Sequence, residues 1–313
     1  MSTPHWDVIV VGGGPAGLSA ALLLGRARRR VLVIDGGRPR NRFADRMHGV
    51  LGWEGVAPEE LRARGRAEVA AYGVELLDDT VNSVSSQEFG IEVNTEGAVT
   101  AQARAVIVAT GLVDELPDLP GLASRWGKTV LHCPYCHGWE VRDARLGVLA
   151  TSPMSVHQVE LVRQWSDRVI FFAAAAGELD DEVISRLGAR GVEIVSERVR
   201  EIRGTGNSIE EVVLEGGANR AVDALFTVGT ARPGDGVLSA LTLDRTDTPV
   251  GSFLAVDTTG RTSNPRVWAA GNVVNPAANV PMSIGAGAMT GGMVNAALVA
   301  EEAVAAVRGV ASS

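Results

Sequence analysis

Short apolar runs alternate with glycine-rich turns and helical segments at the start of the chain. Residues 7–11 form an apolar run short enough for a buried strand, and the run ends in a glycine-rich turn at 12–17. A helical segment at 18–24 and a second apolar strand at 31–34 follow, and the strand leads into Asp35. This order of strand, glycine turn, helix and strand predicts the opening of a Rossmann-type unit.

The glycine turn has the spacing of a dinucleotide-binding fingerprint. Gly12 permits a tight turn, Gly14 lets the backbone approach a pyrophosphate, and Gly17 lets the helix pack against the strand. The N-terminus of the helix that follows stabilises phosphate charge. Asp35 lies about eighteen residues beyond Gly17, close to the spacing of an acid that binds the ribose. The first segment is therefore predicted to bind a dinucleotide.

Two proline-containing stretches separate a middle segment from the rest of the chain. A strand-like run at 105–111 ends in small residues and is followed by prolines within 116–121. A second turn-rich stretch lies at 232–235, and a last strand at 266–270 runs into Gly271. We interpret the two proline-containing stretches as hinges between domains.

The middle segment repeats the alternation of strand and helix. Strands are expected at 146–150 and 169–172, with a helix at 156–165 between them and a closing strand at 223–229. We therefore predict an α/β fold of two Rossmann-like, three-layer ββα domains of nucleotide-binding type, the second inserted in the first. The predicted boundaries are 1–117 with 233–313 for the first domain and 118–232 for the inserted domain.

Length and composition narrow the classes of partner. At 313 residues the chain is long enough for two domains. Its formal net charge of −8 argues against nucleic acid or an anionic membrane surface as a partner. Residues 1–11 lack the pattern of a signal peptide, no apolar run is expected to reach membrane-spanning length, and a long helix of small residues is expected from about Gly285. We expect a cytoplasmic protein that acts on small molecules or on other proteins.

The only two cysteines of the chain, Cys133 and Cys136, are separated by two residues and flanked by His132 and His137. This spacing lets both sulfurs meet at the first turn of a helix, where N–H groups and the helix dipole favour the thiolate and hence disulfide exchange. The absence of further cysteines favours a reducing compartment and a catalytic pair. A zinc site is the alternative, but it needs distant ligands because the adjacent histidines are poorly placed. We predict a redox pair and no metal.

Several other residues are interpreted as structural. Trp53, Trp139, Met154 and Met282 are expected in the core, because large apolar side chains are more often buried than part of a substrate cleft. His157 is expected on a solvated helix face. None of these residues is included in the predicted site.

The motifs together resemble the low-molecular-weight thioredoxin reductases. The resemblance rests on the glycine-rich opening, on Ala-Thr-Gly at 109–111, on Cys-x-x-Cys at 133–136 and on Ala-Gly-Asn at 270–272, and it covers nearly the whole chain. In that family the first and last segments form an FAD-binding domain. The inserted middle domain carries the cysteines and normally binds NADPH.

The resemblance implies FAD contacts from both outer segments. The implied residues are Gly12, Gly14, Pro15, Ala16, Gly17, Asp35, Gly36, Asn41, His48, Val81, Ala109, Thr110, Gly111, Gly271, Asn272 and Val280. For His48, which precedes Gly49, closing a turn is the alternative to contacting FAD. Members of the family usually have aspartate at the position of Asn272, beside the ribityl chain. Asparagine keeps a hydrogen-bond acceptor without the charge, so flavin affinity is expected to survive the change.

The middle domain departs from the family at the two places that bind NADPH. Residues 150–155 contain no glycine to admit a pyrophosphate, and residues 173–176 are alanines where the family has histidine and arginines for the 2′-phosphate. Losing two charge-assisted hydrogen bonds would weaken NADPH binding on the order of 10²–10⁴-fold. A substitute contact from Arg163, Arg168 or Arg186 stays open from the sequence.

The run Cys-Pro-Tyr-Cys-His-Gly at 133–138 resembles the FAD-dependent dithiol oxidases that close disulfides in natural products such as gliotoxin and holomycin. That branch implies electron flow from a small-molecule dithiol to the cysteine disulfide, then to FAD and then to O2. Family analogy makes Cys133 the exchange residue and Cys136 the residue that faces the flavin. His137, at the position of the family's usual acid, and His132 are candidates for proton transfer, because histidine titrates near neutrality; capping of the helix is the alternative role for them. The resemblance also implies a homodimer.

Two other functions stay open from the sequence. A disulfide reductase would take electrons from NADPH at an altered site, or from another donor such as ferredoxin, and pass them to a thioredoxin-like protein. A flavoprotein redox sensor or assembly partner would no longer turn over. The retained cysteine pair argues against the sensor.

Overall fold

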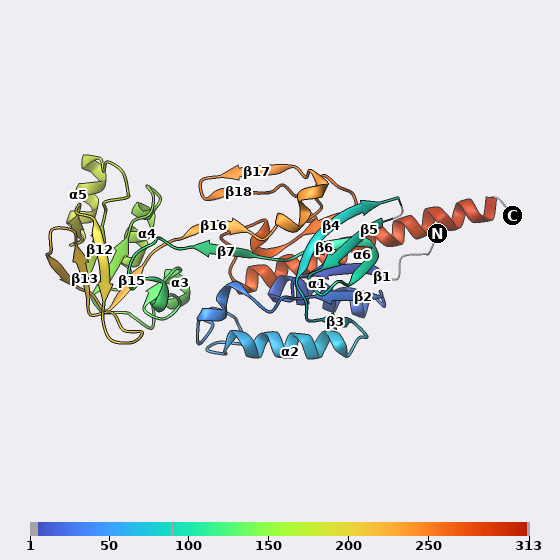
Figure 1. Ribbon diagram of the computed structural model, residues 1–313, viewed down its shortest axis with the longest axis horizontal. Helices are drawn as coiled ribbons and strands as arrows, with labels where there is room; N and C mark the ends of the chain where they lie inside the picture. The colour runs from blue at the N-terminus through green and yellow to red at the C-terminus, as the bar shows by residue number, and fades with distance from the viewer. Residues whose placement is uncertain (1–5, 89, 312–313) are drawn as a thin grey trace. The chain divides into compact units, whose positions relative to one another are not determined.

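The computed structural model describes residues 6–88 and 90–311, and the chain divides into two compact units (Figure 1). The first unit is built from the described parts of 1–42, 59–113 and 231–313, and the second from 43–58 and 114–230. Two strands, β7 (Leu112–Glu115) and β16 (Thr230–Pro233), form a two-stranded sheet where the chain passes from one unit to the other.

A seven-stranded sheet forms the centre of the first unit. Its strands are β1 (Trp6–Val11), β2 (Val31–Ile34), β3 (Glu75–Leu77), β4 (Val81–Gln87), β5 (Gly90–Thr95), β6 (Thr100–Val108) and β19 (Val267–Ala269). The order is β3-β2-β1-β6-β5-β4, and β19 pairs with β6. The β3, β2, β1, β6 and β19 pairings are parallel, whereas β5 and β4 are antiparallel. Every position of β2 is buried, as expected for a parallel strand covered on both faces.

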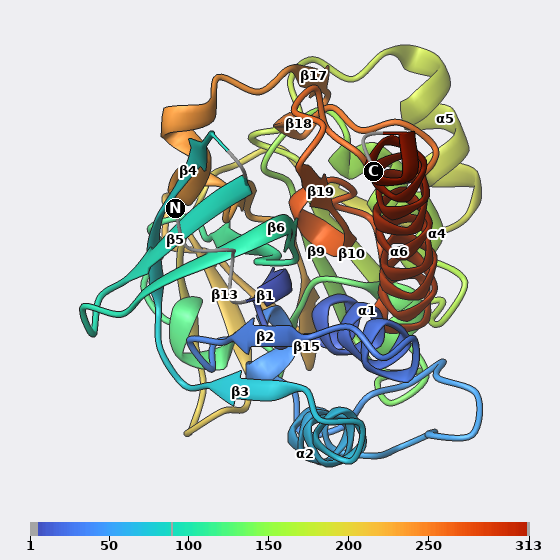
Figure 2. The ribbon, with the colours of Figure 1, turned by 90° about the vertical axis from the view of Figure 1, so that its right-hand side faces the viewer.

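Helices cover this sheet. They are α1 (Pro15–Arg26), α2 (Pro58–Ala70) and α6 (Val280–Ala311), with the 3₁₀ turns η1 (Arg40–Phe43), η3 (Gly236–Leu241) and η4 (Gly271–Val273) and the hairpin β17 (Arg245–Thr248) to β18 (Gly251–Leu254). Figure 2 shows α1 and α6 side by side. Gly287 and Gly291 permit this close packing, because a Cβ atom there would lie only 2.0 Å from the Ala16 carbonyl oxygen and 2.7 Å from that of Ala20.

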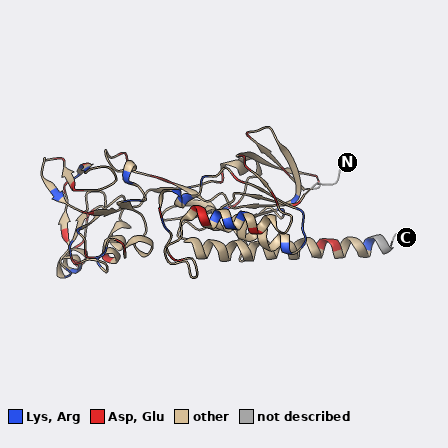
Figure 3. Cartoon of the chain, turned by 90° about the horizontal axis from the view of Figure 1, so that it is seen from below, with Lys and Arg blue, Asp and Glu red and all other residues tan. Residues whose placement is uncertain are grey.

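Helix α6 differs from the sequence expectation in two respects. It begins at Val280 rather than near Gly285, because the side chain of Asn279 accepts a hydrogen bond from the Met282 N–H and caps the helix (3.1 Å). Its residues Val280–Arg308 have the length and composition of a membrane-crossing helix, so the expectation that no run reaches that length is wrong. A core helix passes the same test, and α6 packs along α1. Charges appear on α6 only towards its C-terminal end (Figure 3).

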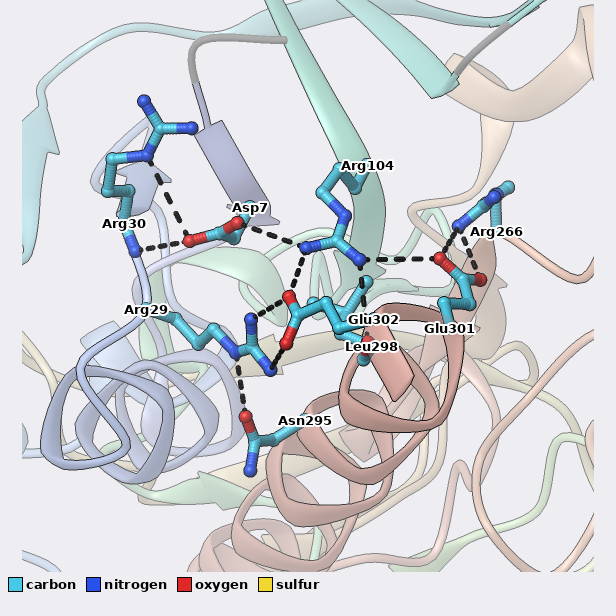
Figure 4. A network of polar contacts seen from close by, with 9 residues as sticks. All are labelled: Asp7, Arg29, Arg30, Arg104, Arg266, Asn295, Leu298, Glu301 and Glu302. Atoms are coloured by element: carbon cyan, nitrogen blue, oxygen red, sulfur yellow. Dashed lines mark hydrogen bonds and ion pairs between the residues drawn. The ribbon is translucent and has the colours of Figure 1, made fainter. Parts of the chain in front are cut away.

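Those charges connect α6 to the sheet through a cluster of ion pairs (Figure 4). Glu302 lies 2.5 Å from both Arg29, which precedes β2, and Arg104 on β6. Glu301 accepts from Arg266, which precedes β19, at 2.6 and 2.8 Å. Hydrogen bonds from the guanidinium groups of Arg29 and Arg104 lower the pKa of Glu302 from 4.5 to about 2. The cluster therefore joins the end of the chain to three separate parts of the first unit.

The second unit contains a five-stranded parallel sheet and a three-stranded antiparallel sheet. The parallel sheet consists of β11 (Glu193–Val195), β10 (Val169–Phe172), β9 (Leu146–Leu149), β15 (Ala224–Phe226) and β8 (Val130–Leu131), in that order. The antiparallel sheet consists of β12 (Val199–Arg203), β13 (Glu211–Leu214) and β14 (Asn219–Ala221). The helices are α3 (Pro134–His137), α4 (Ser155–Val162) and α5 (Asp181–Ala189), with the 3₁₀ turn η2 (Ala123–Arg125). The predicted α/β class with Rossmann-like, layered domains is confirmed.

The segment 43–58 belongs to the second unit, whereas the boundaries predicted from the sequence place it in the first domain. Two contacts explain the difference. Gly127 packs so closely on Phe43 that a Cβ atom there would lie 2.6 Å from the Phe43 Cβ, and Asp45 forms an ion pair with Lys128. Both contacts join residues far apart in the chain, so a strand and helix pattern does not reveal them.

Candidate active site

Cys133 and Cys136 form a disulfide at the start of α3, with their Cα atoms 5.3 Å apart. Cys133 is the N-cap residue, and its sulfur accepts a hydrogen bond from the Cys136 N–H at 3.2 Å. Helix α3 is a single turn of four residues, so a long helix dipole does not act on the sulfurs. The N–H group directed at the Cys133 sulfur supplies local support for a thiolate when the disulfide opens.

Residues in and just after α4 hold this turn in place. A Cβ atom at Gly138 would lie 2.7 Å from the Trp165 ring, and the Tyr135 ring meets the same indole edge-on at 5.7 Å between centroids. The side chain of Gln158 donates a hydrogen bond to the His132 carbonyl oxygen at 3.0 Å. The cysteine turn is therefore fixed on both sides by packing and by a hydrogen bond.

The two predicted histidines lie on either side of the disulfide. His137 is half-buried, and burial lowers its pKa below 6.5; nearby Glu140 opposes that shift, and His48 adds to it. A histidine that is neutral near pH 7 can accept a proton from a thiol. The His132 ring lies 6.3 Å from the Trp126 ring, tilted by 57°. Of the two, His137 thus combines sequence proximity to Cys136 with the environment of a base.

Two aromatic side chains beside the disulfide are exposed. Tyr135 is 74% exposed, and Trp139 is 65% exposed with the Arg142 guanidinium 4.1 Å from its ring centroid. The interpretation of Trp139, Met154 and Met282 as core residues is wrong, because all three are more than half exposed. His157 is exposed on α4, as expected, and Trp53 is partly buried.

The glycine turn of the first unit has the geometry of a pyrophosphate site. Gly12 has a φ of +104°, and a Cβ atom there would lie 2.5 Å from the Ala109 carbonyl oxygen. At Gly17 a Cβ atom would lie 1.9 Å from the Gly12 carbonyl oxygen, so only glycine lets α1 approach the turn. Gly14, just before Pro15 at the first position of α1, has no atom within 4 Å of the place a Cβ would take. Its backbone is open to a phosphate group.

Two side chains near this turn fit a dinucleotide. Asp35, at the end of β2, accepts a hydrogen bond from the Gly37 N–H at 3.1 Å and faces Arg62 at 3.2 Å. Its carboxylate is thus held in place for a ribose hydroxyl. The hydroxyl of Thr110, after β6, is buried without a hydrogen-bond partner among the residues described. A buried hydroxyl beside the Gly111 turn with no partner in the described part of the chain fits a hydrogen bond to a bound cofactor.

The end of β19 approaches the same turn. Gly271 has a φ of +81°, and a Cβ atom there would lie 2.9 Å from the Ala16 Cβ. The side-chain amide of Asn272 donates to the carbonyl oxygens of Asn275 at 2.9 Å and Ala278 at 2.8 Å. Aspartate cannot make these bonds, so asparagine has a structural use at this position and keeps its side-chain oxygen as an acceptor.

The predicted FAD contacts fall almost entirely within one unit. Those in the first unit are Gly12, Gly14, Pro15, Ala16, Gly17, Asp35, Gly36, Asn41, Val81, Ala109, Thr110, Gly111, Gly271, Asn272 and Val280. His48 lies in the second unit, where its Nδ1 is 2.6 Å from Glu54 and its Nε2 is 3.5 Å from Glu140. Sequence reasoning missed these two carboxylates. For Glu140, the signal in the sequence was its spacing of three residues from His137. For Glu54 the sequence offered no comparable signal.

The turn after β9 in the second unit is closed by its own hydrogen bonds. The Thr151 N–H donates to the Ser155 hydroxyl at 3.1 Å, and the Thr151 hydroxyl donates to the Val228 carbonyl oxygen at 2.9 Å. Ser155 is buried. A backbone N–H that would face a phosphate in a nucleotide site is therefore used within the protein.

The three arginines considered as substitute phosphate ligands are engaged elsewhere. Arg163 donates to the carbonyl oxygens of Arg190 at 2.6 Å and Ser166 at 2.9 Å. Arg186 pairs with Glu160 and Glu182 at 3.0 and 2.7 Å. Arg168 donates to the carbonyl oxygen of Asp143. Each would have to leave these partners to bind a 2′-phosphate.

Within residues 6–88 and 90–311, no group of three or more His, Cys, Asp or Glu side chains could hold a metal ion. A cysteine disulfide on one Rossmann-like unit and a dinucleotide turn on another are the two parts of a redox enzyme that combines thiol chemistry with a bound cofactor. The chain belongs to the family described as pyridine nucleotide-disulphide oxidoreductases, whose model matches residues 6–291. Membership of this family implies a flavin cofactor.

Comparisons with individual proteins place the chain near thioredoxin reductases. Thioredoxin reductase tcpT of Claviceps purpurea is 31% identical over 306 residues, which cover 94% of this chain and 95% of the relative. Thioredoxin reductase sirT of Leptosphaeria maculans is 30% identical over 308 residues, 93% of each chain. The crystal structure of HlmI matches with a TM-score of 0.92 and 43% identity over 100% of this chain and 99% of that one. The predicted resemblance to thioredoxin reductases is confirmed.

Proposed function

We propose that the protein is an FAD-dependent dithiol oxidase that closes a disulfide in a small-molecule natural product. The observation that carries the proposal is the turn after β9, where Ser155 accepts the Thr151 N–H that a nicotinamide nucleotide would need. Without a nicotinamide site, the dithiol substrate itself is the proposed source of electrons. In sum, one dithiol and one O2 give one disulfide and one H2O2.

The chain's own residues carry out the thiol chemistry. A substrate thiol transfers its proton to His137, and the resulting thiolate attacks the sulfur of Cys133. A substrate–Cys133 bond forms while the Cys133–Cys136 bond breaks, and the electron pair goes to the Cys136 sulfur. The second substrate thiol then displaces Cys133, which leaves both cysteines reduced. His132 is the second candidate for proton transfer.

The first unit supplies the cofactor site in this proposal. The open backbone of Gly14 and the carboxylate of Asp35 suit the pyrophosphate and a ribose of FAD, and Thr110 offers a buried hydroxyl. When bound, FAD accepts the two electrons of the cysteine pair and passes them to O2. Asn272 offers its side-chain oxygen to a hydroxyl of the cofactor.

Oxygen uptake without any pyridine nucleotide tests the proposal. Purified protein is mixed with a panel of small dithiols, and O2 consumption and H2O2 formation are measured. We expect turnover with at least one dithiol, and none in the Cys136→Ser variant, which keeps the fold but cannot complete the exchange. Failure of every dithiol to drive oxygen uptake would contradict the proposal.

A disulfide reductase is the second candidate, because the relatives tcpT and sirT carry the name thioredoxin reductase. In that case electrons from NADPH or another donor such as ferredoxin would flow towards a thioredoxin-like protein. Anaerobic mixing with NADPH distinguishes the oxidase from a reductase that uses NADPH, and mixing with reduced ferredoxin distinguishes it from one that uses ferredoxin. Rapid bleaching of the flavin would favour the reductase, whereas an unchanged flavin spectrum followed by bleaching with a dithiol favours the oxidase.

The remaining expectations are part of the same proposal. The substrate is a small dithiol, the protein is a homodimer, and it acts in the cytoplasm, where the cysteine pair meets reduced thiols. Light scattering coupled to size-exclusion chromatography measures the oligomeric state. A monomer at micromolar concentration would contradict the expected dimer.

A further inference from the structure

The segment 43–58 holds a histidine between two carboxylates near the redox pair. Nδ1 of His48 lies 2.6 Å from Oε1 of Glu54, and Nε2 lies 3.5 Å from Oε1 of Glu140. The other oxygen of Glu54 accepts the Gly49 N–H at 2.8 Å. Glu54 therefore fixes the ring of His48 through one oxygen and the backbone beside it through the other.

Both ring nitrogens of His48 thus face carboxylate oxygens, Nδ1 through a hydrogen bond with Glu54 and Nε2 through the longer contact with Glu140. The hydrogen bond with His48 is also the main cause of the lowered pKa of Glu54.

The ring of His137 lies next to that of His48. The rings of His48 and His137 are 6.4 Å apart between centroids and meet edge-on at 84°. In the described part of the second unit, the charged groups that act on His137 are Glu140, which favours its protonated form, and His48, which disfavours it. The two groups thus act on the same imidazole with opposite signs.

We propose that His48 is a positioning residue that, clamped by Glu54 and paired with Glu140, acts on the adjacent His137 ring and thereby sets the pH range over which the disulfide is opened. The inference deepens the proposed function and rests on the role of His137 given there. His48 takes no proton from the substrate. It keeps His137 unprotonated and therefore able to accept the proton of the incoming thiol.

Two substitutions that should shift the titration midpoint of His137 in opposite directions test this inference. In His48→Gln a positive neighbour is lost and Glu140 is released, so the titration midpoint of His137 should rise by roughly half to one pH unit. In Glu140→Gln a negative neighbour is lost while the contact of Glu54 with His48 is kept, so the midpoint should fall by a similar amount. Glu54→Gln weakens the clamp and should move the midpoint in the same direction as His48→Gln, by less.

Two properties of each variant are measured. The titration of the His137 ring is followed by NMR on the oxidised holoprotein, and the pH dependence of opening of the Cys133–Cys136 disulfide by dithiothreitol is followed by alkylation and mass spectrometry. The matched control is His157→Gln, which removes an exposed imidazole from α4 in the same unit and should leave both unchanged. Neither measurement needs oxygen turnover, so the absence of oxidase activity would not affect the result.

Opposite shifts of the His137 midpoint in His48→Gln and Glu140→Gln, matched by shifts in the pH profile of disulfide opening, would support the inference. Equal midpoints, or shifts of the same sign, would overturn it. It would also be overturned if the midpoint moved while the pH profile of disulfide opening stayed unchanged, because His137 would then not be the base.

Discussion

Both units have a Rossmann-like fold, but the turn after β1 in the first unit and the turn after β9 in the second differ in whether their backbone N–H groups are available to a ligand. In the first unit, glycines at 12, 14 and 17 bring α1 against the turn and leave the Gly14 backbone open. In the second unit, Thr151 and Ser155 close the turn with their own hydrogen bonds. The comparison teaches that a sheet with helices is not sufficient for nucleotide binding. The capacity lies in a few residues that leave backbone N–H groups available.

The largest effect is expected from a substitution that prevents α1 from packing against the glycine turn of the first unit. In Gly17→Ala the added Cβ would lie 1.9 Å from the Gly12 carbonyl oxygen, and neither backbone can move without displacing α1. We expect destabilisation on the order of 3 kcal/mol and loss of bound flavin. Flavin absorbance of the purified protein and its unfolding in urea measure the two effects.

Gly14→Ala is the matched control for that change. No atom lies within 4 Å of the new Cβ, so the protein should fold as the parent does. Flavin binding should still weaken, because the methyl group takes space that a pyrophosphate needs. A Gly17→Ala protein that retained full flavin and stability would show that the turn does not need this glycine.

A second test introduces into the second unit the two features of a nucleotide site that it lacks, an open turn and a cation for the 2′-phosphate. Replacing Ser155 and Pro153 by glycine removes the hydroxyl that accepts the Thr151 N–H and frees the turn, and Ala174→Arg adds a cation in the segment where the family binds the 2′-phosphate. One charge-assisted hydrogen bond should tighten NADPH binding roughly 10–100-fold. Isothermal titration with NADPH measures the gain, and NADH, which lacks the 2′-phosphate, should gain less.

The control for the graft is Ala174→Arg alone, in which the Thr151 N–H stays bonded to Ser155. It should bind NADPH more weakly than the triple variant, because the charge is present but the turn is closed. Equal affinity of the two variants would mean that the closed turn is not what excludes the nucleotide, and the leading observation for an oxidase would lose its weight.

The sequence predicts those parts of the molecule that depend on local patterns. The fingerprint from Gly12 to Asp35 and the alternation of strands and helices along the chain follow from short apolar runs and glycine spacing, whereas the order of the strands within each sheet was not predicted. The start of α6 was within reach as well, because Asn279 before Val280 and Pro281 is a recognisable helix cap.

Contacts between distant segments could not be predicted in this way. The packing of Phe43 on Gly127 joins positions more than eighty residues apart, and it decides which unit contains His48. The pairing of His48 with Glu140 likewise joins residues far apart in the chain. A single sequence carries no periodic signal for such a pair, so His48 was assigned to the flavin by resemblance alone.

The units also differ in the acceptors that their arginine side chains bind. In the second unit, the guanidinium of buried Arg125 donates to the carbonyl oxygens of Ser208, Gly121 and Gly204 at 2.7 to 2.9 Å. In the first unit, Glu302 accepts from arginines and is itself titratable (Figure 4). Carbonyl acceptors do not titrate, so only the first network should respond to acid.

The smallest expected effect follows from that difference. The folded-state pKa of Glu302 is about 2, below its unfolded value, so its contribution is present above pH 4.5 and is lost as the pH falls towards 2. Because the carboxylate is 46% exposed, screening limits the contribution to about 1 kcal/mol or less. Glu302→Gln should lower the stability of α6 at pH 7 and leave it nearly unchanged at pH 2, as measured by hydrogen exchange in urea. Glu60→Gln, which removes a surface pair with Arg64, is the control. An equal loss at both pH values would assign the effect of Glu302 to packing rather than to charge.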